Sequence, residues 1–333
     1  MKLRALAIVA ALCAAVLLPV HAQAAEQLTI GIAYDMGGLG DRSYNDASLA
    51  GLQKAQKQFS FTVQSTVTDG TSVDREKRIR SLVAKNCNPV IAVGNGYAST
   101  LKSLSVEFPD TQFAILNDAS VDALNVTSII FSGTQGAYLA GFSAALATKS
   151  GTIAMIADPS QADMYKNGFL AGVQASNKKV KSIIKYVSGS PATTAKQAID
   201  AGADILFATT MGSDSDLFSV VVARNLAKKK PKNFHQVSLI SVEPDQYFSV
   251  TASTKKYLIA SVIKRVDKAI YDVIAKAVNN TQYLDILDSV EGIYGHRYGI
   301  TGGGIEFAIY STSLQSQQSL INLAAAKAEK LAG

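Results

Sequence analysis

A carboxylate, a glycine-rich turn, an aromatic ring and an amide follow the first long apolar run of the mature chain. The run from Leu28 to Tyr34 is nearly continuous in hydrophobic residues, as in a parallel strand covered on both faces. Asp35 follows at once, and Tyr44 and Asn45 stand where a helix is predicted to begin. Ligands bind at the carboxyl ends of strands in α/β sheets. The segment therefore favours ligand binding as an alternative to catalysis.

Signatures of common enzyme classes are not found in the sequence. His235 and His296 are far apart and lack metal-ligand spacing, so we expect no metal site and no cofactor. No Gly-x-Ser-x-Gly elbow and no phosphate-binding loop is present. Cys87 is the only cysteine after residue 24, and its apolar neighbours predict an inert, buried thiol.

The first 24 residues have the pattern of a secretory signal peptide. Lys2 and Arg4 precede an apolar stretch, and the small-x-small sequence Ala22-Gln23-Ala24 predicts cleavage after Ala24. A membrane anchor is the alternative, but the apolar run is shorter than the roughly 20 residues that span a bilayer. No lipoprotein motif surrounds Cys13. We therefore expect a soluble, exported protein that is periplasmic or secreted.

The rest of the chain is long enough for two lobes and carries a mildly positive charge. The 333 residues have a formal net charge of +6 at pH 7. The one dense basic run, Lys228-Lys229-Lys230-Pro231-Lys232, ends a helical pattern, where lysines are favoured by the helix dipole. Because no aromatic residues are interleaved with it, we expect no nucleic-acid partner.

Strand and helix patterns alternate along the chain. After the strand at 28–34, helical spacing of apolar residues predicts a helix over 45–57, and the rhythm restarts after Gly151. The segment Leu258–Val278 is interpreted as one long amphipathic helix. Such alternation predicts an α/β protein with doubly wound parallel sheets in two lobes and a ligand cleft between them.

Four stretches resemble a known family. They are Asp35-Met36-Gly37-Gly38 with Asp41-Arg42-Ser43-Tyr44-Asn45, Phe113 to Asp118, Gly136-Ala137-Tyr138-Leu139-Ala140-Gly141, and the pair Asp245-Gln246 with Ser261-Val262-Ile263-Lys264-Arg265. The sequence is similar to the basic-membrane-protein family of substrate-binding proteins for ABC transporters, which includes purine nucleoside receptors. The similarity covers nearly all of the mature chain.

This resemblance implies a type I periplasmic binding protein fold, with three crossover strands and the ligand held between the lobes. We expect a first lobe of residues 25–132 and 249–280 and a second lobe of 133–248 and 281–333. Hinges are expected near Ser132-Gly133, Asp245 to Ser249 and Asn279 to Leu284. The implied partners are a small-molecule ligand and an ABC permease in the membrane, and we expect a monomer.

A nucleoside offers a flat base and a ribose with neighbouring hydroxyls, and the expected site residues suit it. Tyr44 is predicted to stack on the base and Asn45 to read its edge, although Asn45 could instead cap the helix with Tyr44 packed beside it. Asp35 and Asp118 both follow apolar strands and are predicted to accept hydrogen bonds from the ligand.

The remaining expected contacts are Asn95, Tyr165, Phe169, Gly212, Glu243 and Lys264. Tyr165 could stack on the second face of the base, whereas Phe169 suits a core position as well. Lys264 could reach the ligand or only a nearby carboxylate. The segments 209–216 and 241–246 depart from the family pattern, and Glu243 replaces the usual Asp. A different nucleoside, a base or another ring compound such as riboflavin therefore stays open.

Two further functions stay open at this stage. An exported nucleoside-processing enzyme could use the aspartates for catalysis, but Asp35, Asp41 and Asp46 are spread over a loop and a helix start rather than clustered. A sensor that presents its ligand to a membrane receptor could share the same fold.

Overall fold

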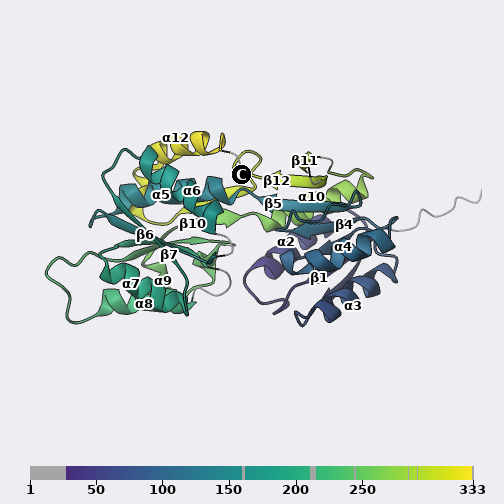
Figure 1. The fold of residues 1–333 in the computed structure, drawn as a ribbon, viewed down its shortest axis with the longest axis horizontal. Helices are drawn as coiled ribbons and strands as arrows, with labels where there is room; N and C mark the ends of the chain where they lie inside the picture. Colours follow the sequence, from purple (N-terminus) through teal and green to yellow (C-terminus); the bar gives the residue numbers. More distant parts are fainter. Residues whose placement is uncertain are drawn as a thin grey trace, which may run out of the picture.

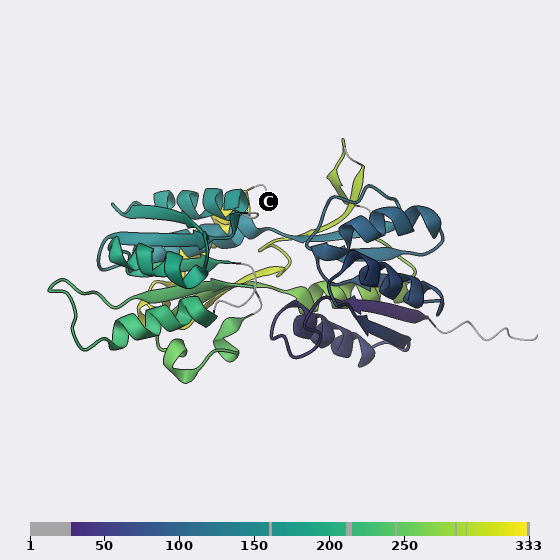
Figure 2. The same cartoon turned by 60° about the horizontal axis from the view of Figure 1, so that its bottom comes forward.

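The computed structural model describes residues 28–159, 162–210, 215–243, 245–283, 285–290 and 292–331. Within these ranges the chain forms two α/β lobes that lie side by side along the long axis of the molecule (Figures 1 and 2). The predicted signal peptide and Gly212 lie outside the described residues.

The first lobe is built on a sheet whose described strands run in the order β11-β12-β5-β4-β3-β1-β2. All neighbours are parallel except the edge strand β11, which is antiparallel to β12. Its strands are β1 (Thr29–Tyr34), β2 (Thr62–Val67), β3 (Val90–Ala92), β4 (Phe113–Leu116), β5 (Val126–Phe131), β11 (Asp285–Asp288) and β12 (Ile293–Tyr298). Its helices are α2 (Tyr44–Gln56), α3 (Ser72–Val83), the short η1 (Asn95–Tyr97), α4 (Ala98–Glu107) and α10 (Val266–Val278).

The second lobe has a sheet whose described strands run in the order β13-β10-β9-β8-β6-β7, with β13 antiparallel to β10. Its strands are β6 (Thr152–Ala157), β7 (Lys181–Tyr186), β8 (Ile205–Thr209), β9 (Ser238–Val242), β10 (Leu258–Lys264) and β13 (Ile305–Ile309). Its helices are α5 (Gly133–Ala147), α6 (Ala162–Ala175), α7 (Pro191–Asp200), α8 (Ser215–Leu226), η3 (Gln246–Phe248), α9 (Ala252–Lys255), α11 (Thr312–Gln315) and α12 (Gln318–Ala328).

In the described ranges the chain passes between the lobes at three places: at Ser132 after β5, at Arg265 after β10, and between β12 and β13. The first place coincides with an expected hinge. The other two differ from expectation, because β10 joins the second sheet whereas β11 and β12 join the first. The expected assignment of all of 249–280 to the first lobe and all of 281–333 to the second lobe is therefore wrong. Sheet membership is decided by long-range strand pairing, which local sequence patterns do not reveal.

The single long helix expected over Leu258–Val278 is also wrong. The segment splits at Arg265 into strand β10 and helix α10. All seven residues of β10 are buried, so the strand has no polar face that would distinguish it from a buried helix.

Helices α5 and α6 pack closely because glycines line their contact. A Cβ atom on Gly141 would lie 2.0 Å from the carbonyl oxygen of Phe169, and one on Gly172 would lie 1.9 Å from that of Tyr138. The motif at 136–141 thus serves helix packing. Helix α5 is buried along most of its length, and no helix within the described ranges combines the length and the apolar character that crossing a bilayer requires.

Candidate ligand-binding cleft

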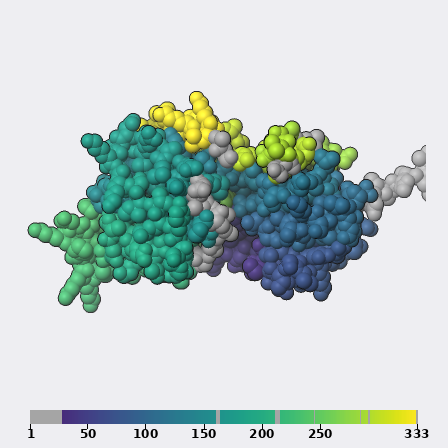
Figure 3. Space-filling model, viewed as in Figure 1, coloured from purple at the N-terminus to yellow at the C-terminus, as the bar shows by residue number. Residues whose placement is uncertain are grey.

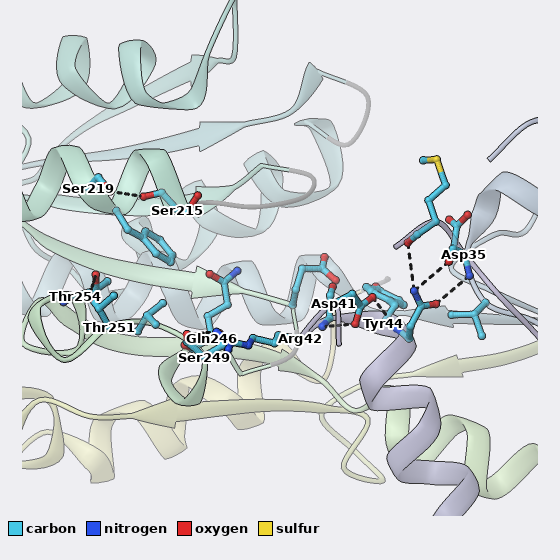
Figure 4. A pocket seen from close by; sticks show the side chains of 18 of the residues that line it. Asp35, Asp41, Arg42, Tyr44, Ser215, Ser219, Gln246, Ser249, Thr251 and Thr254 are labelled. Atoms are coloured by element: carbon cyan, nitrogen blue, oxygen red, sulfur yellow. Dashed lines mark hydrogen bonds between the residues drawn. The ribbon is translucent and has the colours of Figure 1, made fainter. Parts of the chain in front are cut away.

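A cleft of about 1040 Å³ opens between the lobes (Figure 4). Asp35, Tyr44 and Asn95 line it from the first lobe, and Phe218, Glu243 and Gln246 line it from the second. Its volume lies at the upper end of the range of about 300–1000 Å³ that is usual for small-molecule sites. The cleft follows the carboxyl end of β1, where the sequence predicted a binding site.

The loop between β1 and α2 is held by the carboxylates of Asp41, within the loop, and Asp46, in the first turn of α2. The carboxylate of Asp41 accepts hydrogen bonds from the backbone N–H groups of Ser43, Asn45 and Asp46, at 2.8, 3.1 and 3.1 Å, and so caps α2. The carboxylate of Asp46 accepts from the backbone N–H groups of Gly40 and Arg42. These five hydrogen bonds fix the conformation of the loop.

Asn45 is buried, and its amide is engaged within this loop. Its Oδ1 accepts from the backbone N–H of Asp35 at 3.0 Å, and its Nδ2 donates to the carbonyl oxygens of Asp35 and Gly38 at 3.2 and 3.1 Å. Asn45 lines the cleft, but these bonds join the end of β1 to α2. Asn45 therefore holds the loop in place. Its amide has little hydrogen-bonding capacity left for the edge of a base, which was its expected partner.

The carboxylate of Asp35 faces an arginine that the sequence did not single out. Arg75 of α3 donates from Nη2 to Asp35 Oδ1 at 2.9 Å and from Nη1 to the carbonyl oxygen of Gly70 at 2.7 Å. Its guanidinium carbon lies 5.5 Å from the ring centroid of Tyr97. The Asp35 side chain stays 30 % exposed, so it keeps a face toward the cleft.

Two glycines flank this ion pair, and one of them has a backbone conformation that favours glycine. Gly94 has a φ of +108°, and a Cβ there would lie 2.9 Å from Asp35 Oδ2. A Cβ at Gly96 would lie 2.5 Å from Arg75 Nη2. Asn95 between them lines the cleft, which places the turn after β3 next to the end of β1.

A buried ion pair of the second lobe contacts the first lobe at the end of β10. Lys264 Nζ donates to Glu243 Oε1 at 2.9 Å and to the hydroxyl oxygen of Tyr44 at 3.2 Å. The Lys264 side chain is 1 % exposed and that of Glu243 is 22 % exposed. Lys264 does not itself line the cleft, whereas both of its partners do. The carboxylate contact that was one of the two expectations for Lys264 is thus present. A ligand in the cleft would contact Glu243 and Tyr44, and the ammonium of Lys264 lies behind them.

Burial and neighbouring charge act in opposite directions on the pKa of Lys264. Burial is the largest single influence and lowers the pKa of Lys264, but the carboxylate of Glu243 together with the oxygens of Tyr165 and Tyr44 outweighs it and holds this pKa well above its ordinary value. Burial, followed by the charge of Glu243, raises the pKa of Tyr44 well above its ordinary value. Across the neutral range the lysine is charged and the tyrosine hydroxyl is protonated.

Glu243 combines two unusual features. Its φ is +90°, in a region that residues with side chains rarely adopt. Its Oε2 is buried and has no hydrogen-bond partner among the described residues. A strained backbone and an unpartnered carboxylate oxygen are features that gather at binding sites.

A hydrogen bond between described residues joins the two rims of the cleft. Arg42, in the first-lobe loop, donates from Nη1 to the carbonyl oxygen of Ser249 in the second lobe at 3.1 Å. Figure 4 shows Arg42 extending toward Ser249 and Gln246, away from Asp35. The contact spans the opening between the lobes.

Several expected site residues lie elsewhere. Asp118 does not line the cleft; its Oδ1 accepts from the backbone N–H and hydroxyl of Ser120, so it forms a turn, and its neighbour Asn117 lines the cleft instead. Phe169 is fully buried and stacks on Phe207 with ring centroids 5.7 Å apart, which corrects its assignment to the ligand.

Tyr165 is 1 % exposed and also packs against Phe207. Lys264 Nζ lies 5.6 Å from its ring centroid, so Tyr165 lies behind the ion pair and outside the cleft lining. Gly212 is outside the described residues.

Sequence reasoning missed Arg75, Arg42 and Phe218. Phe218 lies on the buried side of α8 among apolar residues, so its pattern indicates only a core position. The described residues contain no cluster of three or more His, Cys, Asp or Glu side chains that could hold a metal ion. The lining of the cleft combines aromatic rings, carboxylates and amides.

Comparison with known proteins places the chain in a family. Residues 29–330 match the model of the family described as "ABC transporter substrate-binding protein PnrA-like". A Listeria innocua protein named "CD4+ T-cell-stimulating antigen" is 30 % identical over 269 residues, covering 75 % of this chain and 73 % of the relative. The Lactococcus lactis "ABC transporter nucleoside-binding protein BmpA" is 26 % identical, covering 75 % and 74 %.

Solved structures share the fold. An ABC transporter solute-binding protein from Aeropyrum pernix aligns with a TM-score of 0.66 at 19 % identity, covering 92 % of this chain and 87 % of the other. The arabinose-binding protein AraP from Geobacillus stearothermophilus aligns with a TM-score of 0.65 at 13 % identity, covering 87 % and 98 %. The expected type I periplasmic binding protein fold is confirmed, and the chain belongs to the PnrA-like family of ABC transporter substrate-binding proteins.

Proposed function

We propose that this substrate-binding protein holds a purine nucleoside, or a similar ring compound, in the cleft between its lobes and delivers it to a membrane permease. The observation that carries the proposal is the pairing of an aromatic residue and a carboxylate on each side of the cleft. Tyr44 and Asp35 line the first lobe, and Phe218 and Glu243 line the second.

The two kinds of group suit the two parts of a nucleoside. Stacking on an aromatic side chain contributes roughly 1–3 kcal/mol per base. Carboxylate oxygens accept charge-assisted hydrogen bonds from ribose hydroxyls, and these are stronger than neutral ones. The unpartnered Oε2 of Glu243 is an acceptor that such a hydroxyl could satisfy. The printed name of the Lactococcus lactis relative, a nucleoside-binding protein, supports the same ligand class.

The proposal includes export, a monomeric state and hinge closure. The signal-peptide pattern of residues 1–24 supports export. The cleft is large for a nucleoside, so the lobes would close on it about the crossings at Ser132, Arg265 and 299–304. Hinges are usually a few residues that absorb the backbone change.

The ligand class is tested by identifying what the purified protein carries. Mass spectrometry of small molecules released on denaturation would name any retained ligand. After removal of that ligand, a panel of purine nucleosides, pyrimidine nucleosides, free bases, riboflavin, sugars and amino acids is tested by thermal shift. We expect the largest rise in Tm with a purine nucleoside, because a ligand that binds only the folded state stabilises it.

A larger shift with sugars or amino acids would contradict the proposed ligand class, and a shift confined to riboflavin would replace the nucleoside with another ring compound. Incubation with nucleosides, followed by an assay for free base, tests the enzyme alternative. Turnover that follows the protein through purification would overturn the transport function.

A further inference from the structure

One end of the second lobe gathers exposed lysines from segments far apart in the sequence. In this lobe α5, α6 and α8 end where β6, β7 and β9 begin, because helices run antiparallel to the strands of a parallel sheet. We call this surface the basic end. Its exposed lysines are Lys149, Lys178, Lys179, Lys181, Lys228, Lys229, Lys230 and Lys232.

Little negative charge balances this surface. Asp204 is 3 % exposed, and its carboxylate accepts from the hydroxyl of Thr148 and the backbone N–H groups of Lys149 and Ser150. Asp200 is exposed but paired with Lys196 at 2.9 Å. Within the described part of the chain, none of the eight lysines of the basic end forms an ion pair.

Helix dipoles account for only part of the cluster. A lysine favours a helix C-terminus only within about the last turn. Helix α8 ends at Leu226, so Lys228 lies close to it, whereas Lys230 and Lys232 lie beyond. Lys181 begins strand β7. The helix dipoles therefore leave an uncompensated positive surface that suits an anionic partner.

Four of the lysines lie on a loop that projects from the lobe. Residues 227–237 connect α8 to β9, and the loop extends past the body of the second lobe in Figures 1 and 3. Leu226 at its base is 66 % exposed, and Lys230 Nζ lies 4.6 Å from the ring centroid of Phe234. The loop thus combines ammonium groups with an exposed aliphatic side chain and an aromatic ring.

The corresponding end of the first lobe is mixed in charge. Lys57 and Lys85 follow α2 and α3 there, but Glu107 ends α4 and is paired with Arg80. The charge asymmetry between the lobes is therefore a property of the second lobe and not of the fold.

We propose that the basic end docks on an anionic lipid surface. The exposed cations of this end are all lysines, which act as mobile point charges, whereas built phosphate sites favour the planar fork of arginine. Arg224, in the last turn of α8, is only partly exposed. Diffuse attraction of a polybasic surface to anionic headgroups needs no such geometry. A nucleic acid is disfavoured because the cluster lacks the several aromatic residues that stack on bases. Docking would hold the protein at the membrane that carries its permease, whichever solute the cleft binds.

The test is co-sedimentation of the full mature protein with vesicles. The probes are vesicles of equal parts phosphatidylglycerol and phosphatidylcholine, and vesicles of phosphatidylcholine alone. We expect binding only to the anionic vesicles, with binding weakened as NaCl rises from about 50 mM to about 300 mM, because salt screens surface charge. The loop variant carries Lys228→Gln, Lys229→Gln, Lys230→Gln and Lys232→Gln, and we expect it to bind about tenfold more weakly or worse.

A matched control variant makes the same charge change on the first lobe, with Lys57→Gln, Lys77→Gln, Lys85→Gln and Lys102→Gln, and should bind nearly as wild type. Wild type, the loop variant and the control variant should have equal Tm values and equal affinities for nucleoside. A failure of membrane docking can then be distinguished from a failure of the proposed ligand binding. Absence of wild-type binding to anionic vesicles, equal losses in both variants, or tighter binding to duplex DNA or RNA than to vesicles at the same salt would overturn it.

Discussion

The ammonium nitrogen of Lys264 lies 3.2 Å from the hydroxyl oxygen of Tyr44, although the two residues belong to different lobes. Tyr44 is the first residue of α2, and Lys264 is the last of β10. The same ammonium pairs with Glu243, which follows β9. The lobes therefore meet at a buried ion pair, one residue before the chain crosses at Arg265.

Replacing one member of this pair should destabilise the protein strongly. Lys264→Met leaves the Glu243 carboxylate without its partner, and breaking a buried ion pair in this way costs about 3–5 kcal/mol. We expect the lower part of that range, because Glu243 is partly exposed. Urea unfolding of ligand-free protein measures the loss. The double variant Lys264→Met with Glu243→Gln should recover most of it, and a single variant as stable as wild type would show that the pair contributes nothing.

The pair should also give stability a defined alkaline limit. In the folded protein the pKa of Lys264 is raised above its ordinary value of 10.5, so the folded state binds this proton more tightly than the unfolded state. The resulting stability is complete below pH 10.5 and is lost as the pH rises through the folded-state pKa. Tyr44, whose pKa is also raised, acts with the same sign.

We therefore expect the unfolding free energy of wild type relative to that of the double variant to stay constant from about pH 7 to about pH 9 and to fall above about pH 10.5. Urea unfolding of both proteins at a series of pH values measures it. A relative stability of wild type that rises with pH would contradict this assignment.

The first strand and the cleft at its end could be predicted because a local pattern indicates both. An apolar run that ends in Asp35 identifies a buried parallel strand, and parallel strands bind ligands at that end. Asp118 follows a similar run, but whether Asn117 or Asp118 faces the cleft depends on the turn. Asn117 has a φ of +60°, and with this backbone conformation Asn117 lines the cleft where Asp118 was expected.

Contacts between distant segments could not be predicted. Arg75 meets Asp35 across 40 residues, and Arg42 meets Ser249 across 207. Neither arginine stands in an unusual local pattern, because a charged residue on a helix or in a loop ordinarily faces solvent. Phe218 has the opposite problem, since an aromatic residue in an apolar helix face predicts only a core position.

The contact between α5 and α6 should not tolerate a single added methyl group. In Gly172→Ala the new Cβ would lie 1.9 Å from the carbonyl oxygen of Tyr138, so the helices must separate. Overpacking of this kind costs about 1–3 kcal/mol. Urea unfolding measures the effect, with the exposed Gln174→Ala on the same helix as control. A Gly172→Ala protein as stable as this control would show that the two helices can move apart freely.

The two strand-end aspartates should separate in their effects on binding. Asp35→Asn removes the charge that faces both Arg75 and the cleft, and losing a charge-assisted hydrogen bond costs about 1.5–3 kcal/mol, or roughly tenfold or more in Kd. Asp118→Asn keeps the turn to Ser120, since both side chains form such turns, and should leave Kd and Tm nearly unchanged. Calorimetric titration with the nucleoside that gives the largest thermal shift measures both Kd values. Weaker binding by Asp118→Asn alone would show that Asp118, as expected from the sequence, contacts the ligand.

The hydrogen bond between Arg42 and Ser249 should favour the approach of the lobes. Arg42 has a φ of +53°, and asparagine tolerates this conformation while being too short to reach Ser249, so Arg42→Asn removes the contact without straining the loop. A single hydrogen bond contributes about 0.5–1.5 kcal/mol, which predicts an affinity roughly two- to tenfold weaker, expressed mainly as faster ligand release. Solution scattering of the ligand-free variant should show a larger radius of gyration than wild type, whereas Lys57→Ala, on the far end of α2, should change neither quantity. Unchanged scattering together with unchanged release would mean that Arg42 exchanges Ser249 for water at no cost and that the hydrogen bond between Lys264 and Tyr44 governs closure instead.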